Sequence, residues 1–144
     1  MDIAAQHFLA GIRWKYRWRS VNLARVHTSG QTLCSSHRCK NVLIEGVTIR
    51  NSPMWILHPV LSENVTIDGV KVISHGPNSD GCDPECCKNV WIKNCYFDTG
   101  DDCIALKSGR NQDGRRIGRP IENVVIQNCE MKDGHGGVVI GERV

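Results

Sequence analysis

Four segments of the chain share one pattern of apolar and polar positions, and each opens with an asparagine. They begin at Asn41, Asn64, Asn89 and Asn123, so successive starts lie 23, 25 and 34 residues apart. Apolar residues alternate within each segment, which is the period of a β-strand, and helical spacing is absent. Internal periods of this length are typical of solenoids, arrays and propellers.

A glycine or asparagine interrupts each segment and predicts a bend between two short strands, because both residue types tolerate tight turns. This position is occupied by Gly46, Gly69, Asn94 and Asn128. A further short apolar run follows each segment, at residues 55–57, 81–83, 103–106 and 137–140. Each repeat is therefore expected to hold two or three short strands.

Repeats of this length, with equivalent strands and no hairpin turns, predict an all-β fold, a right-handed single-stranded parallel β-helix. Each coil, or rung, would stack on the next at the strand spacing of roughly 4.8 Å. A leucine-rich repeat lacks its leucine signature here, and a propeller blade needs about 40 residues and four antiparallel strands. We expect the four leading asparagines to stack as a structural ladder of side-chain amides.

Two rungs carry extra residues, at 75–78 and 110–116. Insertions in a solenoid become loops at the turns and often border the binding groove.

Three polar residues fall at one position of the repeat. Counted from the asparagine that opens each rung, Asp101 and His135 lie 12 residues on, and Asp80 lies 16 on, or 12 without the four inserted residues. We therefore expect Asp80, Asp101 and His135 in a line on one face, with Asp102 beside them. Adjacent carboxylates repel, and converging acids with a histidine suit acid/base cleavage of a sugar linkage.

Other acids are interpreted as turn formers, because aspartate satisfies local backbone groups. Asp68, Asp98 and Asp113 fit this interpretation, and Asp83, which precedes Pro84, allows it as well.

The composition, 40% hydrophobic and 23% charged over 144 residues, is that of an ordinary globular protein. No apolar run approaches the roughly 20 residues of a membrane span. Residues 3–12 are mildly apolar, but their positive charges follow them, which is the wrong order for a secretory signal.

The net charge of +3 hides an asymmetry. Residues 1–40 hold seven basic residues and one acid, which gives +6, so the remainder carries −3. We interpret residues 1–38 as a basic head of uncertain status outside the native domain, and residues 39–144 as a partial β-helix catalytic domain. The head carries Trp14, Tyr16 and Trp18 but no recognition motif, so we expect no nucleic-acid partner.

The eight cysteines do not indicate a metal site or a redox compartment. Cys82, Cys86 and Cys87 lack the paired C-x2-C spacing of zinc sites. Cys95 and Cys129 stand where other repeats carry an apolar residue, so we expect small buried hydrophobic side chains there.

Three motifs also carry a resemblance to a known family. Asn-Ser-Asp-Gly-Cys-Asp-Pro at 78–84, Thr-Gly-Asp-Asp-Cys at 99–103 and Gly-His-Gly-Gly at 134–137 resemble signature motifs of polygalacturonases, glycoside hydrolase family 28. The resemblance runs from about Cys39 to Val144. It implies a pectin-lyase-like β-helix, a secreted or periplasmic monomer, and inverting hydrolysis of α-1,4-galacturonosyl bonds in polygalacturonate or pectin, without a metal or cofactor.

By this resemblance Asp101 would be the general acid, and Asp80 and Asp102 would hold and deprotonate the attacking water. His135 would tune the protonation of the acid and contact the sugar. An inverting site separates its carboxyls by roughly 6.5–9.5 Å and a retaining site by about 5–5.5 Å. Neighbouring rungs are compatible with both, so inversion rests on the resemblance.

A pectic polysaccharide or oligogalacturonate is a polyanion, so cations are expected near the acids. Lys107, Arg110 and Arg115, together with Arg116, are candidates for binding its carboxylates. The long insertion before Pro120 resembles the exo-acting branch of the family.

The chain departs from the family in one motif, a later arginine and lysine one residue apart, which is absent before Val144. We therefore expect this polypeptide alone to be poorly soluble, because a truncated solenoid exposes apolar ends, and weakly active or inactive. A calcium-dependent pectate lyase and a non-catalytic polysaccharide-binding β-solenoid are the alternatives, and the histidine and Asp-Asp motifs favour the hydrolase. Rhamnogalacturonan and xylogalacturonan remain open as substrates.

Overall fold

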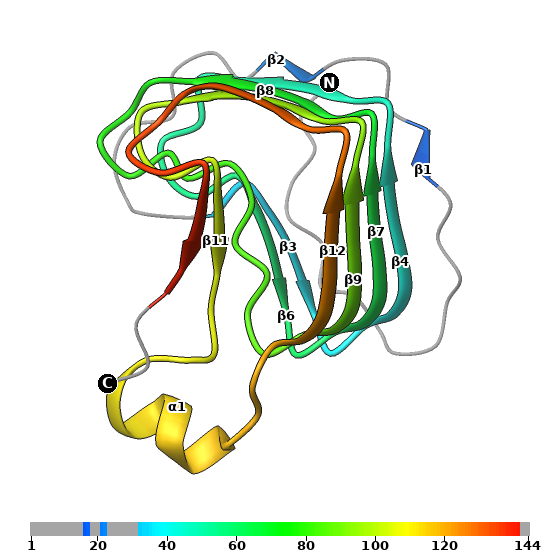
Figure 1. Ribbon diagram of the computed structural model, residues 1–144, viewed down its shortest axis with the longest axis vertical. Helices are drawn as coiled ribbons and strands as arrows, with labels where there is room; N and C mark the ends of the chain where they lie inside the picture. Colours follow the sequence, from blue (N-terminus) through cyan, green and yellow to red (C-terminus); the bar gives the residue numbers. More distant parts are fainter. Residues whose placement is uncertain (1–15, 18–20, 23–31, 142–144) are drawn as a thin grey trace.

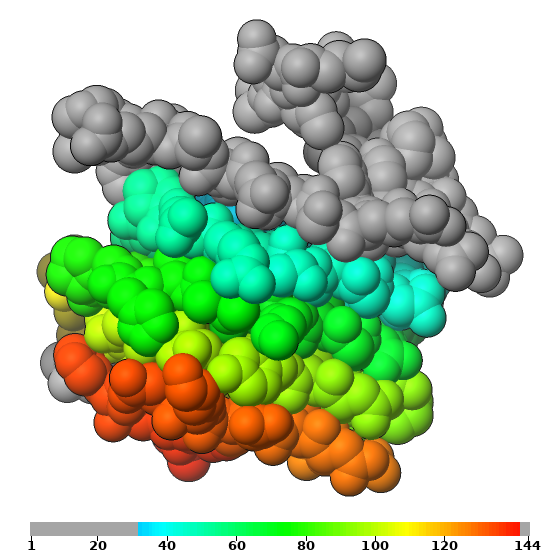
Figure 2. All heavy atoms as spheres, turned by 90° about the horizontal axis from the view of Figure 1, so that it is seen from above, coloured from blue at the N-terminus to red at the C-terminus, as the bar shows by residue number. Residues whose placement is uncertain are grey.

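The chain winds into stacked parallel β-coils, which Figure 1 shows as ribbons in a computed structural model that describes residues 16–17, 21–22 and 32–141. In the space-filling view of Figure 2, successive rungs lie as layers in sequence order. The predicted parallel β-helix is confirmed, because every strand pairing among the described residues is parallel and joins one rung to the next.

Three sheets form the walls of the coil. The first has the order β1 (Tyr16–Arg17), β4 (Lys40–Glu45), β7 (Glu63–Asp68), β9 (Lys88–Lys93) and β12 (Glu122–Gln127). The second has the order β2 (Val21–Asn22), β5 (Thr48–Arg50), β8 (Lys71–Ser74), β10 (Tyr96–Thr99) and β13 (Glu130–Asp133).

The third sheet carries the candidate site and is built from shorter pieces. β3 (Cys34–His37) pairs with β6 (Leu57–Val60), and β11 (Ile104–Leu106) pairs with β14 (Val138–Ile140). Single bridges through Cys82 and Glu85 join these two halves. The segment between them contains Pro84, which has no N–H to donate to a ladder.

The core consists of like residues stacked from rung to rung. Ile44, Ile67 and Ile92 are register partners in the first sheet, and Val65 and Val90 form a parallel column. Ile67, Ile92 and Val65 are fully buried. The alternation seen in the sequence therefore directs one face of each strand inward, as the strand period requires.

The bends follow the predicted residues. Gly46, Gly69, Asn94 and Asn128 all have φ between 51° and 62°, in the left-handed region. Glycine and asparagine reach this region more readily than other residues.

The amide ladder is also confirmed. The side-chain Nδ2 of each asparagine donates to Oδ1 of the one before it, at 2.9 Å from Asn64 to Asn41, and at 3.0 Å both from Asn89 to Asn64 and from Asn123 to Asn89.

The second insertion forms a helix, α1 (Asn111–Ile117), where the sequence predicted a loop. Asp113 lies in its first turn and Arg115 and Arg116 in its last, an arrangement that complements the helix dipole. The helix ends at Gly118, whose φ of 64° lets its N–H donate to the Gly114 carbonyl at 2.9 Å.

The acids interpreted as turn formers belong to regular elements: Asp68 ends β7, Asp98 lies in β10 and Asp113 lies in α1. Asp98 belongs to β10 and is buried, with its carboxylate oxygens 3.1 Å from His75 Nε2 and 3.0 Å from Lys132 Nζ. The interpretation was wrong because Asp98 lies one residue before the end of the strand, on a register shift between β10 and β13.

All eight cysteines lie in the described part of the chain, and no disulfide bond joins two of them. Cys95 is buried in the core as predicted, and Cys129 packs against that core while partly buried. No helix among the described residues is long and apolar enough to cross a membrane. Of the basic head, β1 and β2 pair with β4 and β5, and its status as a separate segment stays a prediction.

Candidate active site

The four acid/base candidates meet at the turn between the second and third sheets. One carboxylate oxygen from each of Asp80, Asp101 and Asp102 lies within 4.8 Å of the others. Nδ1 of His135 lies 3.2 Å from Oδ1 of Asp101, and its backbone N–H donates to the Asp101 carbonyl at 3.2 Å. Asp80 is buried, whereas the His135 side chain is 74% exposed, so the imidazole stands at the mouth of the cluster.

The strand register places Asp80 one residue away from the position that counting from the leading asparagines predicted. Asp80 lies level with Asp102 rather than with Asp101, because Cys82 pairs with Ile104. Eight positions separate Ser74 from Cys82, but only five separate its register partner Thr99 from Ile104. The first insertion thus adds three residues at this turn, not four.

Backbone contacts fix the Asp101–Asp102 turn. Thr99 Oγ1 donates to the Asp101 carbonyl at 2.7 Å, and the Asp102 N–H donates to Oδ1 of Asp101 at 2.9 Å. A Cβ on Gly100 would overlap the Gly76 carbonyl. The glycine before the acids is therefore required by the close approach of the neighbouring rung.

Ser79 ties the first insertion to this turn. Its hydroxyl lies 2.7 Å from the carbonyls of both Ser74 and Gly76, and it accepts the Gly100 N–H at 3.2 Å. The residue before Asp80 thus helps to hold the loop that leads into the site.

Lys107 is the predicted substrate-binding cation that lies in the cluster. Its Nζ is 3.5 Å from Oδ2 of Asp80, 3.1 Å from Oδ1 of Asp83 and 3.9 Å from the ring centroid of Trp55. Trp55 in turn meets His58 edge-on, with ring centroids 5.1 Å apart. The cation is therefore held between two carboxylates and an aromatic ring.

Asp83 is the residue that the sequence interpretation missed. It is fully buried beside Asp80 and Lys107, so it is more than a turn former. The two-residue period of the strand was the available signal: Cys82 points into the core, so Asp83 must point to the outer face, toward the other acids.

Burial and mutual repulsion raise the pKa values of two acids in the cluster. Burial, reinforced by the Asp80 charge, raises the pKa of Asp83 to about 8 against the opposing effect of Lys107. Burial raises the pKa of Asp102, and the charges of Asp101 and Asp80 raise it further. Burial lowers the pKa of Lys107, but the Asp83 and Asp80 carboxylates outweigh it, and the net shift is upward. Asp83 and Asp102 therefore keep their protons to a higher pH than ordinary carboxyl groups do.

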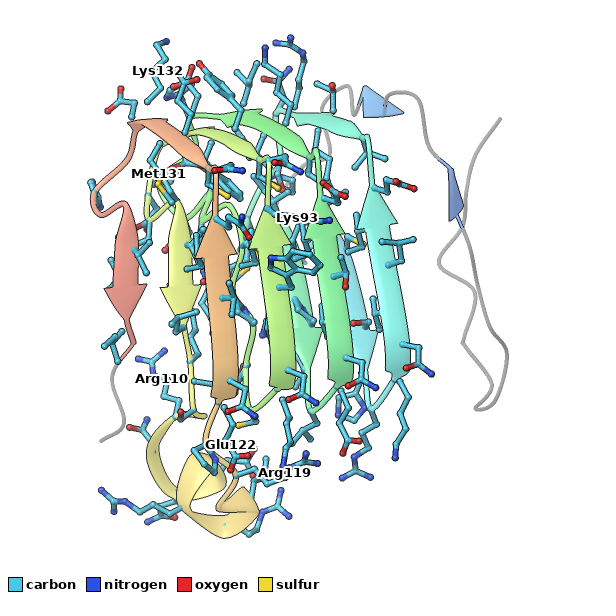
Figure 3. All side chains as sticks on the ribbon, turned by 45° about the vertical axis from the view of Figure 1, so that its right-hand side comes forward. Lys93, Arg110, Arg119, Glu122, Met131 and Lys132 are labelled. Atoms are coloured by element: carbon cyan, nitrogen blue, oxygen red, sulfur yellow. The ribbon has the colours of Figure 1, made fainter. Side chains whose placement is uncertain are left out.

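Arg110 and Arg115 lie elsewhere. Both are exposed, and no hydrogen bond or ion pair among the described residues links either to the acids. Figure 3 shows Arg110 beside α1, at the opposite end of the strands from Met131 and Lys132, which precede the His135 turn.

Comparison with known proteins gives one family. The model for Glycosyl hydrolases family 28 matches residues 10–142. The chain is 37% identical over 101 residues to a Vitis vinifera protein named "Probable polygalacturonase", and covers 21% of it with 69% of its own length. It is 35% identical over 103 residues to an exo-poly-alpha-D-galacturonosidase of Dickeya chrysanthemi, and covers 17% of it with 71% of its own length.

Comparison with solved structures points to the same family. The crystal structure of a hyperthermoactive exopolygalacturonase from Thermotoga maritima matches with a TM-score of 0.76 and 54% identity, over 76% of this chain and 25% of that one. The chain thus spans about a fifth of the length of the curated relatives named here.

Proposed function

The chain belongs to glycosyl hydrolase family 28, and from that premise we propose that it cleaves α-1,4-galacturonosyl bonds of a pectic polysaccharide by acid/base hydrolysis. The observation that carries the proposal is the convergence of three aspartates and a histidine from three successive rungs. Family membership favours this reaction over the pectate lyase and the non-catalytic solenoid.

In this mechanism Asp101 protonates the leaving oxygen, while Asp80 and Asp102 hold and deprotonate water. His135 supports the acid, since its Nδ1 lies 3.2 Å from the Asp101 carboxyl. Burial and the charges of Asp101 and Asp80 raise the pKa of Asp102, so its carboxyl holds a proton more tightly than an ordinary aspartate does. A raised carboxyl pKa beside the proposed acid is the kind of environment in which acid/base catalysts occur.

Inversion is carried over from the family resemblance. The nearest oxygens of the three aspartates lie within 4.8 Å, closer than the roughly 6.5–9.5 Å of an inverting pair. NMR of the first-formed product anomer tests this step directly, because retention of configuration contradicts inversion.

Lys107 is the proposed contact for a galacturonate carboxylate, supported by its place beside Asp80. Arg110 and Arg115 are proposed to meet only a longer chain that reaches α1. Similarity to proteins named as exo-acting supports attack at chain ends. We further propose that the protein acts as a monomer outside the cytoplasm, where pectic polymers occur.

Product analysis on oligogalacturonates tests the proposal. The chain should release new reducing ends, weakly when it is tested alone, without the ultraviolet absorbance of an unsaturated product. Asp101→Asn should lower the rate by about 10²–10⁴-fold, the usual worth of general acid catalysis. Glu45→Gln, at an exposed acid that ends β4, is the matched control and should retain the rate. An unsaturated product, or an unchanged rate for Asp101→Asn, would refute the assignment.

A further inference from the structure

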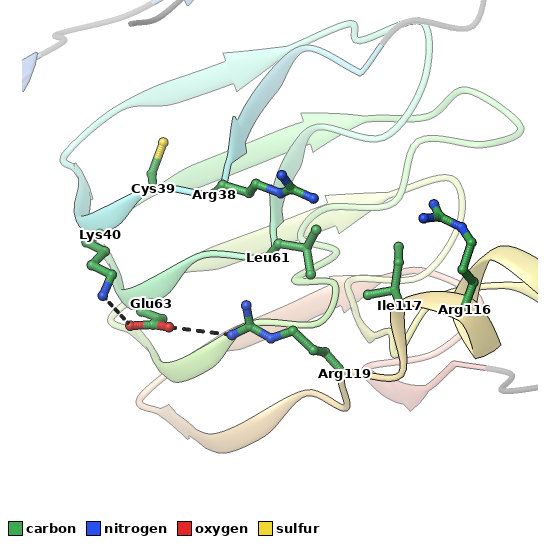
Figure 4. Close-up of a pocket in the computed structure, with 8 residues that line it drawn as sticks. All are labelled: Arg38, Cys39, Lys40, Leu61, Glu63, Arg116, Ile117 and Arg119. Atoms are coloured by element: carbon green, nitrogen blue, oxygen red, sulfur yellow. Dashed lines mark ion pairs between the residues drawn. The ribbon is translucent and has the colours of Figure 1, made fainter. Parts of the chain in front are cut away.

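A cationic hollow lies at the turn between the third and first sheets, away from the acidic cluster. It encloses about 400 Å³, a volume within the range of small-ligand sites. Figure 4 shows its lining, which comes from the turn after β3, the turn after β6 and the segment that carries α1.

Positive charge dominates this pocket. Four cations, Arg38, Lys40, Arg116 and Arg119, face one acid, Glu63, among its lining residues. Clustered arginines are the usual recognition element for carboxylates, because the planar guanidinium can donate two parallel hydrogen bonds.

Two cations are already ordered by Glu63. Lys40 Nζ lies 3.2 Å from one of its oxygens, and Arg119 Nη2 lies 3.5 Å from the other. Both ion pairs are drawn as dashed lines in Figure 4. On α1, Arg116 is held by Asp113, at 2.7 Å and 3.0 Å from Oδ1. The rim therefore holds two separate sets of paired charges, one around Glu63 and one at Asp113.

Arg38 is the cation left for a ligand. Among the described residues it makes no ion pair, and its side chain borders the pocket. Its backbone is in the left-handed region at φ 53°, and its N–H donates to the Val60 carbonyl at 2.9 Å. The turn thus places an unneutralised guanidinium at the hollow.

The pocket also has an apolar side, formed by Leu61 and Ile117. Leu61 is 7% exposed, so its side chain is part of the packed wall. A pyranose ring with a carboxylate matches both halves, because its C–H face can pack on the apolar wall while the acid meets arginine. Inorganic phosphate would leave the apolar wall unmatched.

This pocket is distinct from the catalytic cluster. The Ile56 N–H, just before β6, donates to the Asp80 carbonyl at 2.9 Å, whereas Leu61 follows the other end of the strand. The four residues of β6 span roughly 13 Å at about 3.3 Å per residue.

We propose that this pocket is a second, non-catalytic site that binds a uronate unit of the polysaccharide, with Arg38 as its principal carboxylate contact. The substrate class rests on the proposed function. Such a site would hold the polymer to the protein independently of cleavage.

NMR titration of the Asp101→Asn protein with trigalacturonate tests the proposal, because this substitution should slow turnover by about 10²–10⁴-fold. We expect the Leu61 and Cys39 amides to shift in the pocket, separately from the Gly136 amide at the acids. Arg38→Asn should weaken the Kd read at Leu61 about tenfold, the worth of one charge-assisted hydrogen bond, and leave the Gly136 shift intact. Asparagine suits this substitution because it tolerates the left-handed backbone.

Controls separate the alternatives. Arg50→Asn removes an exposed arginine on β5 and should change neither Kd. Trigalacturonate that saturates Gly136 without shifting Leu61 would overturn the proposal, as would equal affinity at Leu61 for a neutral galactotriose or for inorganic phosphate. The reading at Leu61 does not depend on turnover, so a failure of the proposed hydrolysis would be seen separately, in product analysis.

Discussion

Nζ of Lys107 lies 3.1 Å from Oδ1 of Asp83, a fully buried carboxyl. The two residues come from neighbouring rungs of the third sheet, where both point away from the core. Asp80, at 3.5 Å from the same Nζ, makes Lys107 the shared cation of two buried acids. The charge balance of the site therefore depends on one side chain from β11's end.

Replacement of Lys107 by methionine should destabilise the protein most at high pH. Removing one partner of a buried pair costs up to about 3–5 kcal/mol, because the other charge is left unpaired. At pH 9 Asp83 is ionised, so the loss should be large, whereas at pH 6 it is protonated and the loss should be smaller. Urea unfolding at both pH values measures this. The double variant Lys107→Met/Asp83→Asn should recover stability at pH 9, and an equal loss at both pH values would contradict the pairing.

Asp83 itself should make stability fall as pH rises. Its folded-state pKa of about 8 lies above the ordinary 3.8, so the folded protein binds the proton more tightly than the unfolded chain. The stabilisation is complete below about pH 4 and is lost progressively up to about pH 8, with a slope of at most about 1.4 kcal/mol per pH unit.

The urea midpoint of Asp83→Asn, compared with that of the parent protein from pH 5 to 9, isolates this contribution. The stability of Asp83→Asn should fall less steeply as pH rises, because the contribution of the Asp83 carboxyl is absent. Parallel curves for the two proteins would exclude Asp83 as the titrating group.

The scaffold could be predicted from the sequence because its stacking is periodic. An asparagine in each rung and like residues in each column repeat the same local choice, so Asn89 and Asn123 could be aligned by counting. The register position of Asp80 relative to Asp101 and Asp102 could not be predicted by counting. It depends on where β8 ends and on how many inserted residues lie in the turn that follows. The Lys107–Asp83 contact was equally hidden, because it joins two rungs through side chains whose reach no spacing specifies.

The amide ladder should contribute measurable stability through Asn89. Its side chain donates to Asn64 and accepts from Asn123, both at 3.0 Å, and its φ is 56°. Asn89→Ala should cost about 1–3 kcal/mol, from the lost hydrogen bonds and the left-handed backbone. Asn89→Gly keeps the backbone freedom and loses only the ladder hydrogen bonds. Its midpoint temperature of thermal unfolding should therefore lie between those of the parent protein and Asn89→Ala. A glycine variant as unstable as the alanine variant would assign the whole effect to the hydrogen bonds.

Activity should depend on Gly136, one of the glycines of the Gly-His-Gly-Gly motif at 134–137. A Cβ there would overlap a side-chain methyl of Val139 and lie 3.1 Å from Oδ1 of Asp102, so Gly136→Ala must move the Val139 side chain and press on the Asp102 carboxyl. Misplacement of a catalytic group by about 1 Å can cost about 10²-fold. Gly137→Ala is the matched control, because its Cβ would meet only Met131 atoms at the ordinary distance of 3.9 Å. Initial rates on oligogalacturonates, read beside far-ultraviolet circular dichroism, should show Gly136→Ala folded but slow and Gly137→Ala close to the parent. Equal rates for the two variants would show that the Asp102 carboxyl does not need its present position.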